Sequence, residues 1–183
     1  MRTRTLSDRR WKRCASPGFT LIEIMVVVVI IGIMVTFAVL SIGSRGLDER
    51  LSLEARRLQE LISLASDQAV LQGVELGFVQ TETGYEFLEL KDGKWIPAGD
   101  GPLRSRDMPE PLFISLTVEG RRVAPIKTGE AADPKTELKP QVLLLSSGEG
   151  SEFVLDVRAQ QYAPHFVLQG DVLGRLKMER KDS

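Results

Sequence analysis

The sequence predicts an α+β protein in which one long N-terminal helix, whose first half spans a membrane, packs on an antiparallel β domain. Three observations support this fold class. An uncharged apolar run covers residues 24–42, an amphipathic pattern with steps of three and four residues continues to Gln72, and short strand patterns fill residues 74–178. The 183 residues suffice for one globular domain and an accessory segment.

The segment before Gly18 is strongly basic. Its six cations stand against the single acid Asp8, a net charge of +5, so the remainder of a chain whose total is −1 carries −6. A body this acidic argues against nucleic-acid binding, which depends on Lys and Arg contacts with phosphates. The only cysteine, Cys14, also lies in this segment. A form that begins after it has no disulfide, thiolate nucleophile or cysteine metal site.

The apolar run predicts a membrane-spanning helix. Its nineteen uncharged residues are close to the roughly 20 that cross a bilayer core, and the basic segment before them keeps the N-terminus in the cytoplasm. A cleaved secretory signal is an alternative, although its apolar region is shorter. A lipoprotein signal places its cysteine after the run, whereas Cys14 precedes it, and a twin-arginine signal at Arg9-Arg10 does not suit Glu23.

The sequence GFTLIE, residues 18–23, follows the basic leader and opens the apolar run. This order of parts resembles the class III signal of type IV pilins and type II secretion pseudopilins. The resemblance implies that prepilin peptidase cuts between Gly18 and Phe19 and methylates the new amino terminus on Phe19. It also implies that Glu23 serves assembly by pairing with a Phe19 amine. An acid at the centre of a membrane helix costs roughly 2.5–3.5 kcal/mol, so such acids are usually paired.

The helix is expected to run from about Thr20 to Gln72, with Gly73 as its C-terminal cap. Gly43 and Gly46 each cost roughly 1 kcal/mol of helix propensity, which predicts bending or local melting between them. We divide the chain into a cleaved leader (1–18), a transmembrane helix and filament core (19–43), an amphipathic continuation (44–73) and a periplasmic β domain (74–183). The continuation buries an apolar stripe, namely Leu47, Leu51, Ala55, Leu58, Ile62, Ala65 and Ala69.

Strand patterns follow Gly73, and no helical period of convincing length appears after it. The predicted strands are residues 74–80, 85–90, 95–96, 111–120, 141–147, 152–157, 165–170 and 174–178, with KDGK at 91–94 as a turn. The two most apolar runs, 111–120 and 141–147, are predicted to form the centre of a sheet. Residues 97–111 and 121–140 read as solvated connections, although the second is also a candidate partner contact.

The C-terminal part carries a second resemblance. PQVLLLSSGEGSEFVLDV, followed by LQGDVLGRLKM, is similar to the corresponding half of minor pseudopilins of the H class. There a strand leads into a Ser-Gly-Glu turn, a second strand with Phe follows, and the last hairpin has a glycine near its tip. The matching residues are structural rather than recognition elements; they are Ser147, Gly148, Glu149, Phe153, Gly170 and Gly174.

Nothing in the sequence predicts an enzyme or a cofactor. The only histidine, His165, sits in a predicted strand and reads as a packed or surface residue. There is no G-x-S-x-G elbow, P-loop or H-E-x-x-H pair. Acids are spread through strands and turns without a clustered metal set, which leaves open only a loop-bound calcium through Asp100 or Asp133.

The two resemblances together imply a type IV pilin-like fold and a minor pseudopilin of a bacterial type II secretion system. Such a subunit crosses the inner membrane once, keeps its N-terminus cytoplasmic and its C-terminal domain periplasmic, and assembles near the tip of a short filament that helps export folded proteins. Its implied partners are other major and minor pseudopilins through helix bundling, prepilin peptidase, the inner-membrane assembly platform and, before assembly, the lipid bilayer. No nucleic acid is expected.

Two alternatives remain at this stage. The nearer one is a minor pilin of a type IV pilus that takes part in DNA uptake, for which the basic tail of Arg175, Lys177, Arg180 and Lys181 would supply phosphate contacts. The other, of a different class, is a periplasmic enzyme held by an uncleaved anchor.

Overall fold

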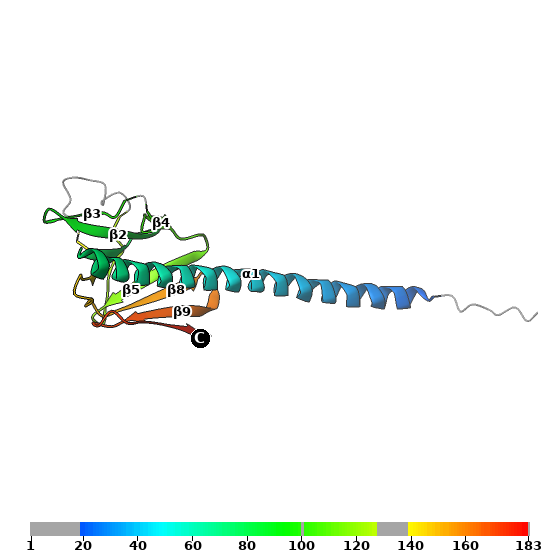
Figure 1. Cartoon of the computed structure of the whole chain (residues 1–183). Coiled ribbons are helices and arrows are strands. Elements are labelled where there is room, and N and C mark those ends of the chain that lie inside the picture. The colour runs from blue at the N-terminus through cyan, green and yellow to red at the C-terminus, as the bar shows by residue number, and fades with distance from the viewer. Residues whose placement is uncertain (1–18, 100, 128–138, 183) are drawn as a thin grey trace, which may run out of the picture. The chain divides into compact units, whose positions relative to one another are not determined.

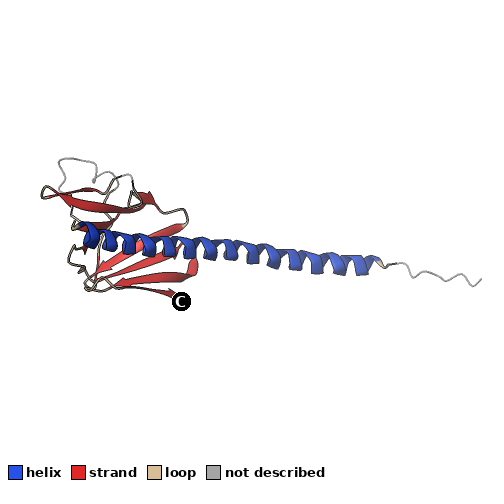
Figure 2. Cartoon of the chain, in the orientation of Figure 1, coloured by secondary structure: helices blue, strands red, loops and turns tan. Residues whose placement is uncertain are grey.

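The computed structural model describes residues 19–99, 101–127 and 139–182, without the side chains of residues 37–45. Two compact units divide the chain, Met1–Gly43 and Ser44–Ser183. The helix α1, Leu21–Gln72, contributes to both units, and the ten strands found among the described residues belong to the second (Figure 1). Figure 2 shows this division of helix and strands, and the α+β class is confirmed.

The predicted end of α1 is confirmed in detail. Gly73 adopts a positive φ of 66°, which a residue without a Cβ adopts at no steric cost. The Val74 N–H donates to the Ala69 carbonyl at 3.1 Å. This six-residue closure is the Schellman arrangement, and it satisfies a carbonyl that the helix end would otherwise leave without a partner.

The middle of α1 differs from the prediction. The helix runs without interruption through Gly43 and Gly46, where the sequence predicts bending or local melting. The propensity cost of two glycines, roughly 1 kcal/mol each, is small beside the cooperative gain of continuing a helix already formed on both sides. The prediction of local melting is therefore wrong.

The first sheet has the strand order β3-β2-β1-β7, with β4 paired to the other end of β2, and every pairing is antiparallel. The predicted KDGK turn joins β2 to β3, where Asp92 and Gly93 both have positive φ, as a tight two-residue hairpin requires. The strands are β1 Leu76–Gln80, β2 Gly84–Lys91, β3 Lys94–Pro97, β4 Arg106–Asp107 and β7 Val142–Leu144.

The second sheet has the order β10-β9-β8-β5-β6 and is also antiparallel. Strand β8 is central in this order and pairs with β5 on one side and β9 on the other. The strands are β5 Leu112–Val118, β6 Arg121–Arg122, β8 Phe153–Ala159, β9 Tyr162–Gly170 and β10 Leu176–Lys181.

The predicted sheet centre is wrong. Residues 111–120 and 141–147 give β5 and β7, which lie in different sheets, and β7 is a three-residue edge strand. The apolar side chains of β7 alternate between buried Val142 and Leu144 and exposed Leu143. The run of consecutive apolar residues in this strand therefore does not mean that both of its faces are buried. One face is buried, and an apolar residue happens to lie on the exposed face.

One core joins the two sheets to the second half of α1. The predicted stripe supplies six residues that are at most 4% exposed: Leu51, Ala55, Leu58, Ile62, Ala65 and Ala69. They belong to the same cluster as Phe78 and Phe87 of the first sheet and Leu116, Leu155 and Leu168 of the second. The helix therefore covers the inner faces of both sheets, as Figures 1 and 2 show.

The segment 97–111 is more than a solvated connection. It includes β4, and its Leu103 and Met108 are 5% and 8% exposed within the main core. The four prolines of this segment mask the pattern that would reveal a strand, because each removes a backbone donor and restricts its neighbour.

Truncating a core residue of α1 tests the shared core. Leu58→Ala, at 1% exposure, is expected to lower the free energy of unfolding of residues 44–183 by about 2–5 kcal/mol through lost burial and a cavity. Leu53→Ala, on the same helix at 59% exposure, should change it by less than about 0.5 kcal/mol. Urea unfolding followed by circular dichroism measures both, and equal losses would contradict this packing.

Candidate functional site

The first turn of α1 is capped from within the chain. The Thr20 hydroxyl and carbonyl oxygens both accept the Glu23 N–H, at 3.3 and 3.1 Å. Thr20 followed three residues later by Glu23 has the spacing of a capping box. A carboxylate in the first turn also interacts favourably with the positive end of the helix dipole. Thr20 thus caps the helix and Glu23 is the acid of its first turn, an arrangement that sequence reasoning missed although the T-x-x-E spacing signals it.

The first unit is apolar on every side of the helix. The large apolar side chains from Leu21 to Val35 are 42–79% exposed, and Phe19 is 75% exposed. A helix that is apolar all round is not stable as a monomer surface in water and requires a bilayer or other helices around it. Glu23 is the only charged residue in this described stretch, and among the described residues none forms an ion pair with it.

Within the side chains that the structure describes, no helix has the length and hydropathy needed to cross a membrane. Residues 37–42 of the predicted span lie outside that set. The leader, including Gly18, Cys14 and the Gly18–Phe19 bond, also lies outside the described residues. Cleavage and methylation therefore stay predictions here.

The turn after β7 and the turn between β9 and β10 meet beside α1. We call their meeting point the turn cluster, and it brings together most of the residues that carry the C-terminal resemblance. The ring of Phe153 covers Gly170, where an added Cβ would overlap a ring carbon. Gly174 lies against the Gly148 carbonyl, 2.7 Å from where its Cβ would be, and both glycines have positive φ. Glycine is thus required here for close approach and for backbone conformation.

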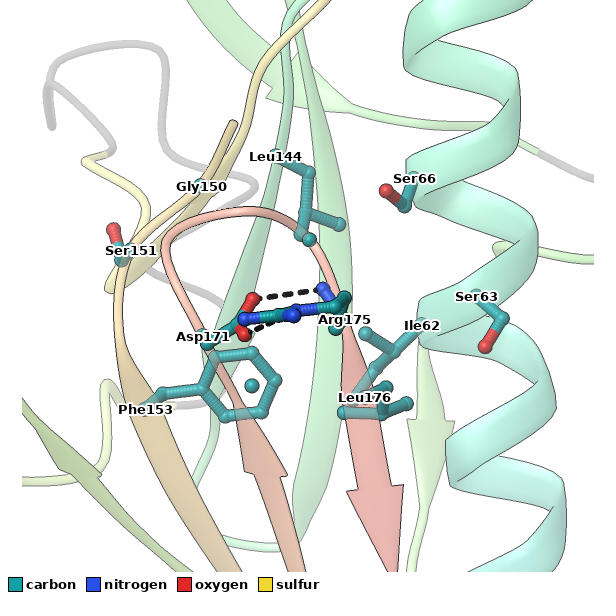
Figure 3. A pocket seen from close by; sticks show the side chains of 12 residues that line it. Ile62, Ser63, Ser66, Leu144, Gly150, Ser151, Phe153, Asp171, Arg175 and Leu176 are labelled. Carbon is teal, nitrogen blue, oxygen red and sulfur yellow. Dashed lines mark hydrogen bonds and ion pairs between the residues drawn. The ribbon is translucent and has the colours of Figure 1, made fainter. Parts of the chain in front are cut away.

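Two carboxylates fix these turns. Asp171 accepts the backbone N–H groups of Leu173 and Arg175 at 3.0 Å and the Arg175 Nε–H at 2.7 Å, as Figure 3 shows for the side chains. The hydrogen bond from the Arg175 backbone is the main cause that holds the pKa of Asp171 below its usual value. Glu75 accepts the Ser146 N–H at 3.0 Å and its hydroxyl at 2.7 Å. Neither role was predicted. No local pattern marks Glu75, whose partner is far away in the chain, whereas the partners of Asp171 lie only two and four residues ahead of it.

The space enclosed by this cluster is too small for a substrate. A cavity of about 20 Å³ lies between Ile62 and Ser66 of α1 and the residues around Phe153 and Arg175 (Figure 3). That volume holds about one water molecule. This cavity therefore takes no substrate, and the contacts of Phe153, Gly170 and Gly174 are those of closely packed turns.

His165 is packed rather than poised for catalysis. It is 4% exposed, and its Nδ1 lies 3.1 Å from the Ala163 carbonyl, which assigns the proton to Nδ1. Its Nε2 then accepts from the Arg158 guanidinium at 3.3 Å. Both ring nitrogens are thus occupied within β8 and β9. In the described part of the chain no three His, Cys, Asp or Glu side chains form a metal group; Asp100 and Asp133 lie outside it.

The basic tail is largely neutralised within the chain. Arg175 pairs with Asp171 at 2.7 Å, Lys177 with Glu179 at 2.5 Å, and Arg180 with Asp48 of α1 at 3.0 Å. Cations already paired with carboxylates contribute less to phosphate binding, which depends on free positive charge. The proposed partner loop, 121–140, is described only in part: Arg121 and Arg122 form β6, and residues 128–138 lie outside the described residues.

Comparison with known families gives two matches. Residues 54–171 match the family described as type II transport protein GspH, a range that runs from Glu54 of α1 to Asp171 and includes Gly148, Phe153 and Gly170. Residues 14–39 match the prokaryotic N-terminal methylation motif, which includes Gly18, Phe19 and Glu23.

Individual relatives agree. A type II secretion system protein H of Pseudomonas aeruginosa is 39% identical over 144 residues, 77% of this chain and 82% of the relative. A type II secretion system protein H of Aeromonas hydrophila is 31% identical over 175 residues, 91% and 95% of the two chains. In fold, the chain is similar to the minor pseudopilin EpsH of Vibrio cholerae, with a TM-score of 0.57, 19% identity and coverage of 71% and 96%. It is also similar to the Escherichia coli GspH solution structure, with a TM-score of 0.53 at 20% identity, covering 72% and 88%.

Substituting the glycine under Phe153 tests the turn cluster. Gly170→Ala is expected to cost about 1–3 kcal/mol of unfolding free energy, because the added Cβ overpacks against the ring. Phe153→Leu in the same chain should recover part of that loss by removing ring atoms. Gly101→Ala, which has open space around it, is the matched control and should stay within about 0.5 kcal/mol. Denaturant unfolding is the measurement, and a harmless Gly170→Ala would refute the close contact.

Proposed function

The chain belongs to the family of the type II transport protein GspH, a minor pseudopilin of the type II secretion system, and from this premise we propose that it joins a short periplasmic filament near its tip. In this role it helps export folded proteins across the outer membrane. It acts as a structural subunit, and the chemistry done on it is processing of its amino terminus. Assembly with other pseudopilins is the function through which it serves secretion.

One observation carries the proposal: a capped helix start, apolar on every side, that lies within the N-terminal methylation motif. Such a helix needs lipid before assembly and other helices after it. We propose that residues 19–43 cross the inner membrane once and later enter the filament core, with 44–73 as the amphipathic continuation. The basic leader, 1–18, faces the cytoplasm, and the β domain, 74–183, lies in the periplasm.

We further propose that prepilin peptidase cuts the Gly18–Phe19 bond and methylates the Phe19 amine. The cut removes the +5 leader and creates a cation at the start of the helix, close to the one acid in the described part of the apolar segment. In a dry helix bundle, the Glu23 carboxylate is strongly disfavoured unless it is paired. The amine of a neighbouring subunit is a partner that the filament itself supplies, and the inner-membrane assembly platform brings the two together.

The internal pairing of the tail cations supports secretion over DNA uptake. Arg175, Lys177 and Arg180 each lie within ion-pair distance of a carboxylate of this chain. The body of the chain also carries −6 after loss of the leader, which opposes binding to a polyanion.

Processing is tested by intact-mass analysis of the protein extracted from membranes. The wild-type chain is expected to begin at Phe19 and to carry one additional methyl group. Gly18→Val should retain the leader, because a branched side chain before the bond obstructs the protease. Ser16→Val, two residues away, introduces the same side chain outside the cut bond and should be processed as wild type. A wild-type protein that begins at Met1 would contradict the proposal.

The assembly role of Glu23 is tested with two substitutions that separate its charge from the side-chain capping that the T-x-x-E spacing indicates. Glu23→Gln retains a side chain suited to the capping box but removes the charge, whereas Glu23→Ala removes both. Both are expected to insert in the membrane, yet to enter the filament at least about tenfold less well, because removing one member of a buried ion pair costs about 3–5 kcal/mol.

The measurement is the fraction of subunit recovered with sheared filaments, together with secretion of a folded substrate. Glu82→Gln, an exposed acid of the β domain, is the control and should behave as wild type. Normal incorporation of Glu23→Gln with failure of Glu23→Ala would assign Glu23 to helix capping alone and remove the ion pair.

A further inference from the structure

One carboxylate ties α1 to the last two strands of the second sheet. The Tyr162 hydroxyl of β9 donates to Oδ1 of Asp48 at 3.2 Å, and Nη1 of Arg180 in β10 donates to Oδ2 at 3.0 Å. The two donors lie 114 and 132 residues away from Asp48 along the chain. We call these three residues the Asp48 clasp. It joins the first turns of α1 within the second unit to β9 and β10.

Both donors are held in position for this contact. The Arg180 Nε–H donates to Asp182 at 3.0 Å, and the guanidinium carbon lies 6.0 Å from the centre of the Phe166 ring, within the range of a cation–π contact. Desolvation, and then the hydrogen bond to Asp48, raise the pKa of Tyr162, so its hydroxyl keeps the proton that it donates. The clasp therefore forms from side chains that are already oriented.

The helical turn before the clasp is weak by itself. Gly43 and Gly46 precede Asp48 by five and two residues, and glycine is the poorest helix former apart from proline. The boundary between the two compact units falls after Gly43. An added Cβ at Gly46 would lie in open space, so the described chain does not pack against the helix at this position. Leu47 is only partly buried against the core, and full burial begins at Leu51.

We infer that the Asp48 clasp is a salt-sensitive lock that keeps residues 43–47 helical. In a continuous helix the N–H groups of residues 47–50 donate to the carbonyls of residues 43–46. A closed clasp fixes this turn on the domain, so that the helix propagates through the glycines at little cost. An open clasp leaves the turn free to melt, while the helix beyond Leu51 stays with the core. The clasp acts within one chain and does not depend on the proposed function.

The clasp can open because it lies at the surface. The side chains of Arg180 and Asp48 are 43% and 31% exposed. An exposed ion pair contributes little stability, and it weakens as salt screens its charges. The buried contact around Leu51 holds α1 wherever the fold is retained, whereas the clasp responds to ionic strength. Its release turns residues 43–47 into a flexible joint at the boundary between the compact units.

Amide hydrogen exchange tests the lock, measured by mass spectrometry on the full chain in detergent micelles. Arg180→Gln and Tyr162→Phe each remove one contact of the clasp and leave the sequence of α1 unchanged. Both are expected to speed exchange of the amides of residues 47–50, by about threefold for Arg180→Gln, the size of effect that an exposed ion pair supports. Exchange of residues 58–69 should be unchanged, because the core holds those turns.

Lys181→Gln is the matched control. It removes a cation of the same strand whose side chain is exposed and lies on the opposite face from Arg180, so exchange should match that of the wild type. Unchanged exchange of residues 47–50 in Arg180→Gln overturns the lock. Equal acceleration along all of α1 also overturns it, because this result reports a general loss of stability rather than local melting.

Salt and helix propensity give two further readouts in the same measurement. Raising NaCl from about 0.05 M to about 1 M shortens the Debye length to about 3 Å, and it should speed exchange of residues 47–50 more in the wild type than in Arg180→Gln. Adding Gly46→Ala to Arg180→Gln should slow exchange again, because alanine favours the helix and has open space at this position. An equal salt response in both chains, or no rescue by Gly46→Ala, refutes the lock.

Discussion

The apolar contact between the second half of α1 and the two sheets is the interaction on which the remaining structure depends. Both sheets turn aromatic or branched side chains, such as Phe87 and Leu155, toward the helix, and one cluster unites all three elements. The helix contributes Leu58 and Ile62 between the alanines 55, 65 and 69. Small residues let the sheets approach closely, while the larger ones fill the space between them.

The polarity and exposure of the side chains on α1 differ between its two halves and between the two sides of its second half. Along the second half, one side is buried in the domain and the opposite side presents leucines bordered by charge. Along the described first part, every side is apolar, and the only charge is Glu23 in the capped first turn. Folding therefore uses only part of the apolar surface of α1, and the remainder is available for lipid and neighbouring subunits.

Sequence reasoning predicted the features that depend on local periodicity. The helix and its Gly73 cap, the Asp92-Gly93 turn and most strand positions follow from spacing and turn chemistry. The pairing of the strands could not be predicted in this way. The sequences of β5 and β7 do not indicate which strand lies next to each of them, or that the strands form two sheets. The Glu75 carboxylate contacts Ser146, far away in the chain, so no local pattern could reveal that contact. The partners of Asp171 lie only two and four residues ahead of it, and the Thr20 cap lies three residues before Glu23, so local spacing could have signalled both.

The contact between Glu75 and Ser146 has a mechanical consequence. Glu75 follows the end of α1 by three residues, and its carboxylate holds both the backbone and the hydroxyl of Ser146 in the turn after β7. A load applied along the helix axis during filament growth therefore passes into the β domain at its far end as well as through the apolar contact. Charge-assisted hydrogen bonds resist displacement in a defined direction, whereas apolar surfaces slide more readily. The subunit is thus braced against shear at the point where its helix ends.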